Sequence, residues 1–175
     1  MKKFSFTDET KVWCGITLHR IKAEIAFGIV VKGELGGFIA KEENLDHDGD
    51  AWVYGDARVS GIAWVSGDAR VYGDARVSDN ARVYGDAWVS GDASIMWISK
   101  IGSRNGTTTF FRSKLGIEVS CGCFFGTIDQ FAEKVGQTHG DNEHGKAYRL
   151  AIEIARLHIN QSNEILEPTE SEELK

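Results

Sequence analysis

Short apolar strands and glycine turns alternate through the middle of the chain with a period of six residues. From residue 49 to residue 102 the sequence reads, in sixes, GDAWVY, GDARVS, GIAWVS, GDARVY, GDARVS, DNARVY, GDAWVS, GDASIM and WISKIG. The third position is alanine in the first eight hexads, and the fifth is valine or isoleucine in all nine. Because residues two apart share one face of a strand, each hexad predicts a short strand with one apolar face.

The pair Gly-Asp that opens most hexads predicts a turn. Glycine adopts positive φ without steric cost, and an aspartate side chain can bond its own backbone. Each hexad is therefore one flat side followed by one corner. A helix is excluded here, since a glycine at every sixth residue would cost about 1 kcal/mol each and valine lowers the helix propensity further.

The hexads resemble the left-handed parallel β-helix of hexapeptide-repeat proteins, in which three hexads complete one triangular coil. The resemblance covers residues 49–102 and implies a β-solenoid of about three coils. Coils stack at ~4.8 Å, so the solenoid would be about 15 Å tall, with unpaired strand edges at both ends. Proteins of this class are usually homotrimers, and the resemblance therefore implies a homotrimer.

The segments on either side of the repeats are expected to cap the solenoid. Residues 1–48 predict a small β-rich N-terminal cap, because apolar and polar residues alternate over residues 21–25. Residues 103–159 predict an α+β C-terminal domain with two strands and two helices. Residues 160–175 are rich in glutamate and predict an acidic mobile tail.

The elements of the C-terminal domain follow from local patterns. The two strands are predicted at residues 107–112 and 117–125. The first helix is predicted to begin at Thr127, because Thr127 and Gln130 have the spacing of a capping box. The second helix is predicted from about Lys146 to Ile159. Its expected buried stripe consists of Ala147, Leu150, Ala151, Ile154 and Leu157.

Three further segments resemble modules of phage and prophage hexapeptide-repeat proteins. They are residues 32–45 (KGELGGFI through EENL), residues 102–107 (GSRNGT) and residues 122–127 (GCFFGT). The resemblance extends over nearly all of the chain up to residue 159. It includes no active-site motif that maps onto this sequence.

The charge of the chain disfavours nucleic acid and membranes as partners. The formal net charge is −6, and the eight clear hexads carry four arginines against seven aspartates, which repel the phosphates of duplex DNA. No apolar run approaches the roughly 18–20 residues that cross a bilayer, and the first residues lack the apolar stretch of a signal peptide. The chain is therefore expected in the cytoplasm, in that of the host cell if a phage encodes it.

Catalytic and metal-binding patterns are weak. Hexapeptide-repeat acyltransferases resemble one another in using a histidine base, but no histidine lies within the hexads, and His47 is the only nearby candidate. Cys121 and Cys123 are one residue apart, which is not the spacing of a structural zinc site. We therefore predict no metal and no cofactor. These two cysteines and Cys14 are expected to be reduced, buried, small hydrophobic residues, and the corner aspartates to be solvated.

The outward positions of the strands are the most informative. With three hexads per coil, outward residues stack at every third hexad, and an arginine stacked on an indole contributes about 0.5–2 kcal/mol. The expected columns are Trp52, Arg70 and Trp88 on a first side, Arg58, Arg76 and Ser94 on a second, and Trp64, Arg82 and Lys100 on a third. The predicted interface or ligand residues are Trp52, Tyr54, Arg58, Trp64, Arg70, Tyr72, Arg76, Arg82, Tyr84 and Trp88.

These columns have two interpretations. They can bury one another in the interface of a homotrimer, or they can line clefts between subunits that hold a planar anionic ligand such as a nucleotide. We therefore expect a non-enzymatic, homotrimeric binding protein of phage or prophage type that sequesters or blocks a host defence component, either a nucleotide signal or a protein. The alternatives are a coenzyme A-dependent acyltransferase with His47 as its base, and a structural trimerisation module.

Overall fold

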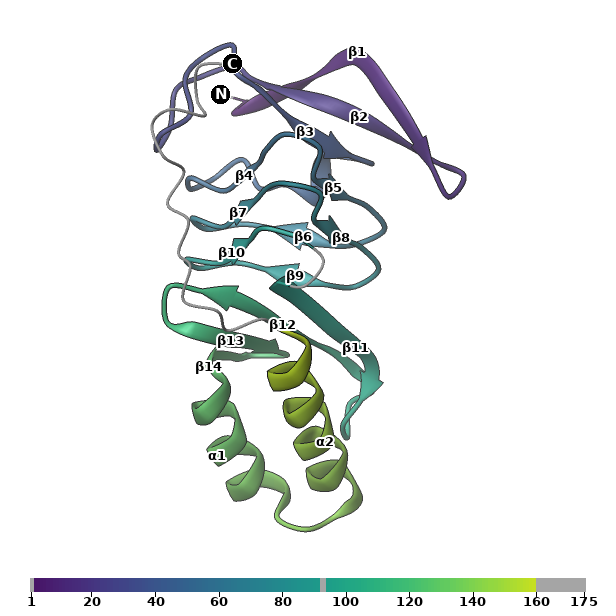
Figure 1. The fold of residues 1–175 in the computed structure, drawn as a ribbon, viewed down its shortest axis with the longest axis vertical. Helices are drawn as coiled ribbons and strands as arrows, with labels where there is room; N and C mark the ends of the chain where they lie inside the picture. Colours follow the sequence, from purple (N-terminus) through teal and green to yellow (C-terminus); the bar gives the residue numbers. More distant parts are fainter. Residues whose placement is uncertain (1, 92–93, 160–175) are drawn as a thin grey trace.

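The computed structural model describes residues 2–91 and 94–159, which form a column with three parts (Figure 1). A β-hairpin lies at one end, a stack of short strands forms the middle, and a sheet with two helices lies at the other end. The repeats therefore lie between the two flanking segments. The hairpin consists of β1 (Phe4–Trp13) and β2 (Ile16–Ala23).

The middle of the column is a β-solenoid, as the hexads predicted. Within the described residues, seven hexads contribute one short strand each, and every one of these strands pairs in parallel with the strand three hexads away. The alanines and valines of these hexads are buried and form the core of the stack. The strands are β4 (Trp52–Val53), β5 (Arg58–Val59), β6 (Trp64–Val65), β7 (Arg70–Val71), β8 (Arg76–Val77), β9 (Arg82–Val83) and β10 (Trp88–Val89).

Glycine opens the corners because the backbone there is left-handed. Gly49, Gly67 and Gly85, at the same corner of successive turns, have φ angles of 69°, 67° and 70°. A Cβ atom on Gly49 would also lie 2.6 Å from the carbonyl oxygen of Gly67. The period of six therefore reflects both the conformation of each corner and the close stacking of one corner on the next.

Parallel pairing begins before the first hexad. Strand β3 (Leu35–Ile39) pairs with β5, and Leu45 forms a parallel bridge with Val65 directly after the 3₁₀ helix η1 (Glu42–Asn44). Ile39 and Leu45 belong to the same buried cluster as the valines of the hexads. Part of the segment that the sequence assigns to the N-terminal cap therefore continues the solenoid.

Two polar side chains cover the open strand edge at the start of the solenoid. The buried Nζ of Lys3 donates to the carbonyl oxygens of Gly49 and Ala51 at 3.3 and 3.0 Å. The Nδ2 of Asn44 donates to the carbonyl oxygen of Ala63 at 2.7 Å. These bonds supply partners to carbonyl groups at the end of the ladder, which an open solenoid would leave unpaired.

The last part of the repeat leaves the solenoid. Strand β11 (Ile95–Ile101) pairs antiparallel with β12 (Gly106–Ser113), whereas the hexads predicted a parallel coil to residue 102. Trp97 stands where most hexads have glycine, so the chain does not turn there and continues as a longer strand. The sheet order is β11-β12-β13-β14, with β13 (Gly116–Cys121) and β14 (Phe124–Thr127).

The single strand predicted over residues 117–125 is in fact two strands. Gly122 has a φ of 62°, and β14 folds back antiparallel on β13. The start of helix α1 (Ile128–His139) confirms the predicted capping box. Thr127 Oγ1 accepts from the backbone N–H of Gln130 at 3.3 Å, and Gln130 Oε1 accepts from that of Thr127 at 2.9 Å.

Helix α2 (Glu143–His158) begins before its predicted start at Lys146. The predicted buried stripe is wrong for Leu150, Ile154 and Leu157, which are exposed. The helix carries two apolar stripes, and it packs through the one that contains small alanines and lies against α1 and the sheet. The residues buried on α2 are Gly145, Tyr148, Ala151, Ile152 and Ala155.

The acidic tail predicted at residues 160–175 lies outside the described residues. No helix of the described chain combines the length and the apolar character that a membrane span requires.

Candidate functional site

The solenoid has three sides, and each side is a ladder of strands taken from every third hexad. The first side consists of β4, β7 and β10, and the third of β6 and β9. The second consists of β5 and β8, which continue a sheet with β1, β2 and β3 in the order β1-β2-β3-β5-β8. Ser94 and Lys100 lie outside these parallel ladders, because Ser94 directly precedes the antiparallel strand β11 and Lys100 lies within it. The columns that form are Trp52, Arg70 and Trp88 on the first side, Arg58 and Arg76 on the second, and Trp64 and Arg82 on the third.

Trp52 is fully buried, although the sequence analysis placed it on the outer surface. The ring centroids of Phe4 and Phe27 lie 6.4 and 5.4 Å from that of Trp52. Gly36 lies so close that a Cβ atom on it would be 2.7 Å from the indole. Within the described part of the chain, the indole Nε1 has no hydrogen-bond partner. Trp52 therefore anchors the N-terminal cap and is not accessible to a ligand.

A pocket of about 220 Å³ lies on the first side. Its lining includes Tyr54, Arg70 and Trp88, three of the residues predicted for a ligand site. The flanking segments complete it with Ile29 from the N-terminal cap and Lys114 from the turn between β12 and β13. The periodicity of the sequence gives no signal for Ile29 or Lys114, because both residues lie outside the repeats.

Three corner aspartates line the same pocket. Asp50, Asp68 and Asp86 follow the stacked glycines of one corner, and all three are exposed. Among residues 2–91 and 94–159, no group of three or more His, Cys, Asp or Glu side chains is arranged to hold a metal ion. The carboxylates therefore present hydrogen-bond acceptors beside the positive charges of Arg70 and Lys114.

Tyr72 lies next to Trp88 on the first side, with 6.0 Å between the ring centroids. Burial raises the pKa of Tyr72 to about 12, although a hydrogen bond with Ser90 acts in the opposite direction. The phenol therefore stays protonated near neutral pH and keeps its hydroxyl proton as a hydrogen-bond donor. Tyr72 supports the ring of Trp88 from the side.

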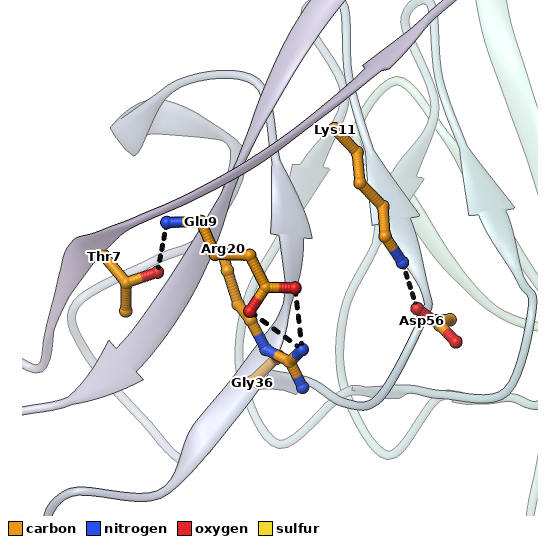
Figure 2. Close-up of polar contacts among 6 residues, drawn as sticks. All are labelled: Thr7, Glu9, Lys11, Arg20, Gly36 and Asp56. Carbon is orange, nitrogen blue, oxygen red and sulfur yellow. Dashed lines mark hydrogen bonds and ion pairs between the residues drawn. The ribbon is translucent and has the colours of Figure 1, made fainter.

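The β1–β2 hairpin packs along the second side (Figure 2). Lys11 forms an ion pair with Asp56 at a corner of the solenoid, and Arg20 Nη1 donates to Glu9 Oε1 at 3.1 Å within the hairpin. The ring centroid of Trp13 lies 5.5 Å from Cζ of Arg76. The arginine column of the second side therefore contacts the protein's own hairpin.

The other arginine of that column is partly enclosed. Arg58 is half-buried, and its buried Nε has no hydrogen-bond partner among residues 2–91 and 94–159. Neither Arg58 nor Arg76 lines the pocket on the first side. The structure thus separates the predicted ligand residues into one group around the pocket and another beside the hairpin.

The third side carries exposed apolar side chains. Trp64 is 38% exposed, and Ile62 at the neighbouring corner is 65% exposed. Arg82 is also exposed, whereas Tyr84 packs on Phe125 of β14 with 4.5 Å between the ring centroids. The exposed part of the predicted column on this side is therefore Trp64 with Arg82.

His47 is held within the N-terminal cap. Its Nδ1 accepts from the backbone N–H of Lys3 at 3.1 Å, so its Nε2 carries the proton and donates to Glu42 Oε1 at 2.8 Å. Its ring stacks on that of Phe4, with centroids 4.4 Å apart and an interplanar angle of 13°. Both ring nitrogens have partners, which gives His47 a structural role at this end of the solenoid.

The predicted burial of the cysteines is wrong for two of the three. Cys14 and Cys123 are exposed, because each lies in or beside a hairpin turn. Cys121 is half-buried in β13, where its Sγ accepts from Thr108 Oγ1 at 3.1 Å and lies 3.6 Å from the hydroxyl of Tyr148. The alternation of inward and outward residues does not show where a strand ends. The prediction therefore put Cys123 inside one long strand, whereas it lies in the turn between β13 and β14.

Comparison with known proteins supports the assignment of the repeat. The model of the family described as YdcK beta solenoid repeat matches residues 75–91, which contain strands β8, β9 and β10. No curated protein matches the chain. The family match and the parallel ladders together identify a β-solenoid repeat protein.

Proposed function

We propose that the protein is a non-enzymatic, homotrimeric binding protein of phage or prophage type that sequesters a nucleotide signal of a host defence system. In this proposal the solenoid is the left-handed coil of the hexapeptide-repeat class, and three subunits lie side by side with ligand clefts between them. The observation that carries the proposal is the pocket on the first side, where Arg70, Trp88 and a column of carboxylates surround one space.

The chemistry of this pocket fits a nucleotide that has few phosphates. Tyr54 and Trp88 offer aromatic faces on which a base can stack. Arg70 and Lys114 supply positive charge for a phosphate, and the aspartates accept hydrogen bonds from the exocyclic amino group of a base or from sugar hydroxyls. Three carboxylates beside two cations disfavour a polyphosphate. A nucleoside monophosphate or a cyclic nucleotide with an amino-substituted base therefore fits best.

The size of the pocket supports a site shared between subunits. Its volume of about 220 Å³ is below the roughly 300–1,000 Å³ of ordinary small-molecule sites. One chain therefore supplies part of an enclosure for a nucleotide, and the neighbouring subunit of the homotrimer would supply the rest.

Isothermal titration calorimetry with a panel of mono- and cyclic nucleotides tests the proposal. We expect Arg70→Ala to weaken binding by about tenfold or more, because it removes a charged hydrogen-bonding group from the pocket. Arg82→Ala is the matched control, since it has the same position in its hexad but lies on the third side. Absence of binding by every nucleotide of the panel would refute the nucleotide site.

The third side favours a second version, in which the sequestered component is a protein. Exposed Ile62 and Trp64 form an apolar surface of the kind that binds other proteins. In this version Trp64→Ala prevents inhibition of the defence system, and Arg70→Ala has no effect on it. Inhibition that survives Trp64→Ala but not Arg70→Ala would favour the nucleotide.

A further inference from the structure

The outer face of α2 carries an apolar stripe that the described chain leaves open. Leu150, Ile154 and Leu157 are 60%, 50% and 88% exposed. Half-buried Ala147 continues the stripe toward the start of the helix. The helix packs on α1 and the sheet through a different face, which contains Tyr148. The exposed stripe is therefore not needed for the fold of the single chain.

The spacing of the stripe is that of a helix–helix seam. The apolar residues of this outer face are at positions 147, 150, 154 and 157, which alternate between the a and d positions of a heptad. A helix that packs on a globular core shows a wider apolar face, as α2 does on its buried side. A narrow a and d stripe is typical of a helix that packs against another helix.

We propose that this stripe packs against the same stripe of α2 in a second copy of the chain, with the two helices parallel. The proposal rests on the assembly of the proposed function and names the helical surface that takes part in it. In Figure 1, α2 runs along the column, so parallel α2 helices fit subunits whose solenoids are also parallel. Subunits related by a single rotation axis meet this condition.

The polar residues beside the stripe favour this occupant and this direction. Glu153 and His158 occupy the g and e positions that flank the seam. In a parallel pair, Glu153 of one copy faces His158 of the next, a side chain that carries no negative charge. An antiparallel pair would place Glu153 beside its own equivalent, and the two negative charges would repel.

Size-exclusion chromatography with light scattering on the full chain tests the proposal. We expect Leu157→Glu to raise the concentration at which half of the protein is assembled by about tenfold or more, because it places a charge in an apolar seam. Thr138→Glu, which adds the same charge to the exposed face of α1, is the matched control and should leave assembly unchanged.

Disulfide cross-linking provides a second measurement that does not depend on disruption. In a chain with Cys14→Ser and Cys123→Ser, Leu157→Cys should form covalent dimers on mild oxidation, because parallel packing brings residue 157 of both copies together. Thr138→Cys should not. An unchanged mass for Leu157→Glu, together with no cross-link through residue 157, overturns the proposal and points to another occupant of the stripe.

The same measurements separate this inference from the proposed function. If the wild type is a trimer and Leu157→Glu leaves it intact, the proposed homotrimer stands and the α2 seam is overturned. If the wild type is a dimer and Leu157→Glu dissociates it, the seam is supported and the proposed homotrimer is overturned. A wild-type monomer at micromolar concentration overturns both.

Discussion

Phe110 and Phe111 are neighbours in β12, yet they lie in two different hydrophobic cores. Phe111 belongs to the cluster of solenoid alanines and valines, whereas Phe110 belongs to the cluster between the sheet and the helices. Phe110 contacts Phe131 of α1, with ring centroids 6.1 Å apart. Successive side chains of a strand point to opposite faces, so a single strand both closes the solenoid and supports the helical pair.

Truncating each phenylalanine should loosen a different part of the column. We expect Phe110→Ala and Phe111→Ala each to lower the free energy of unfolding by about 3–5 kcal/mol, as buried phenylalanines do in well-packed cores. Hydrogen exchange should rise first in α1 and α2 for Phe110→Ala and in β9 and β10 for Phe111→Ala. Denaturant titration with exchange mass spectrometry measures both effects. The same exchange pattern in the two variants would contradict the division into two cores.

Corner glycines should differ in their tolerance of a side chain. Gly49 and Gly55 both have positive φ, at 69° and 56°. A Cβ atom on Gly49 would meet the carbonyl oxygen of Gly67 at 2.6 Å, whereas one on Gly55 would meet nothing within 4 Å. Gly55→Ala should therefore cost about 1–2 kcal/mol, the cost of a left-handed alanine, and Gly49→Ala should cost more. Denaturant titration measures this difference, and equal costs would mean that the corners do not stack closely.

The period of the sequence was sufficient to predict the solenoid but not its ends. Trp52 and Trp88 stand in nearly identical hexads, GDAWVY and GDAWVS, yet Trp52 is fully buried and Trp88 is half-buried. The difference comes from Phe4 and Phe27, which belong to the N-terminal cap and lie far from Trp52 in sequence. A repeat pattern gives each hexad the same environment, so it cannot predict which coil a cap covers.

Only the part of the candidate pocket that the repeats supply was predictable from the sequence. Arg70 and Trp88 follow from the stacking of every third hexad, and the corner aspartates follow from the period of six. Lys114 reaches the pocket only because the C-terminal sheet covers the end of the solenoid, a tertiary arrangement that no local pattern encodes. Helix α2 shows a related limit, since its sequence contains two apolar stripes and only packing decides which one is buried.

The hairpin should become less firmly attached to the solenoid in acid. A hydrogen bond from Lys11 lowers the pKa of Asp56 below its usual value of 3.8. A carboxylate with a lowered pKa stabilises the fold above its unfolded pKa, and this contribution is lost as the pH falls through the folded pKa. Both partners are partly exposed, so the contribution should be below about 1 kcal/mol.

We expect Asp56→Asn to abolish this loss of stability in acid, as measured by denaturant titrations at decreasing pH. The variant should also raise hydrogen exchange in β1 and β2. Asp74→Asn, at the equivalent corner of the next coil, is the matched control. An acid profile that is the same for Asp56→Asn and the wild type would show that the ion pair does not hold the hairpin.

Lys3 should stabilise the open end of the solenoid, and its contribution to the free energy of unfolding should change with pH in the alkaline range. Its Nζ donates to the carbonyl oxygens of Gly49 and Ala51, so Lys3→Met should lower the free energy of unfolding by about 1–3 kcal/mol near neutral pH. Burial lowers the pKa of Lys3 from 10.5, although nearby aspartates oppose this effect. Between the lowered pKa and 10.5 the unfolded chain binds more protons than the folded one. The free energy of unfolding of the wild type should therefore rise with pH through this window, relative to Lys3→Met.

Urea titrations at increasing pH measure this rise in the wild type and in Lys3→Met. Lys134→Met, on the exposed face of α1, is the control for the loss of a positive charge. If the free energies of unfolding of the wild type and Lys3→Met differ by a constant amount up to pH 10.5, the ammonium group is hydrated. The backbone edge at this end of the solenoid would then be open to water, because the same ammonium group is what covers the carbonyl oxygens of Gly49 and Ala51.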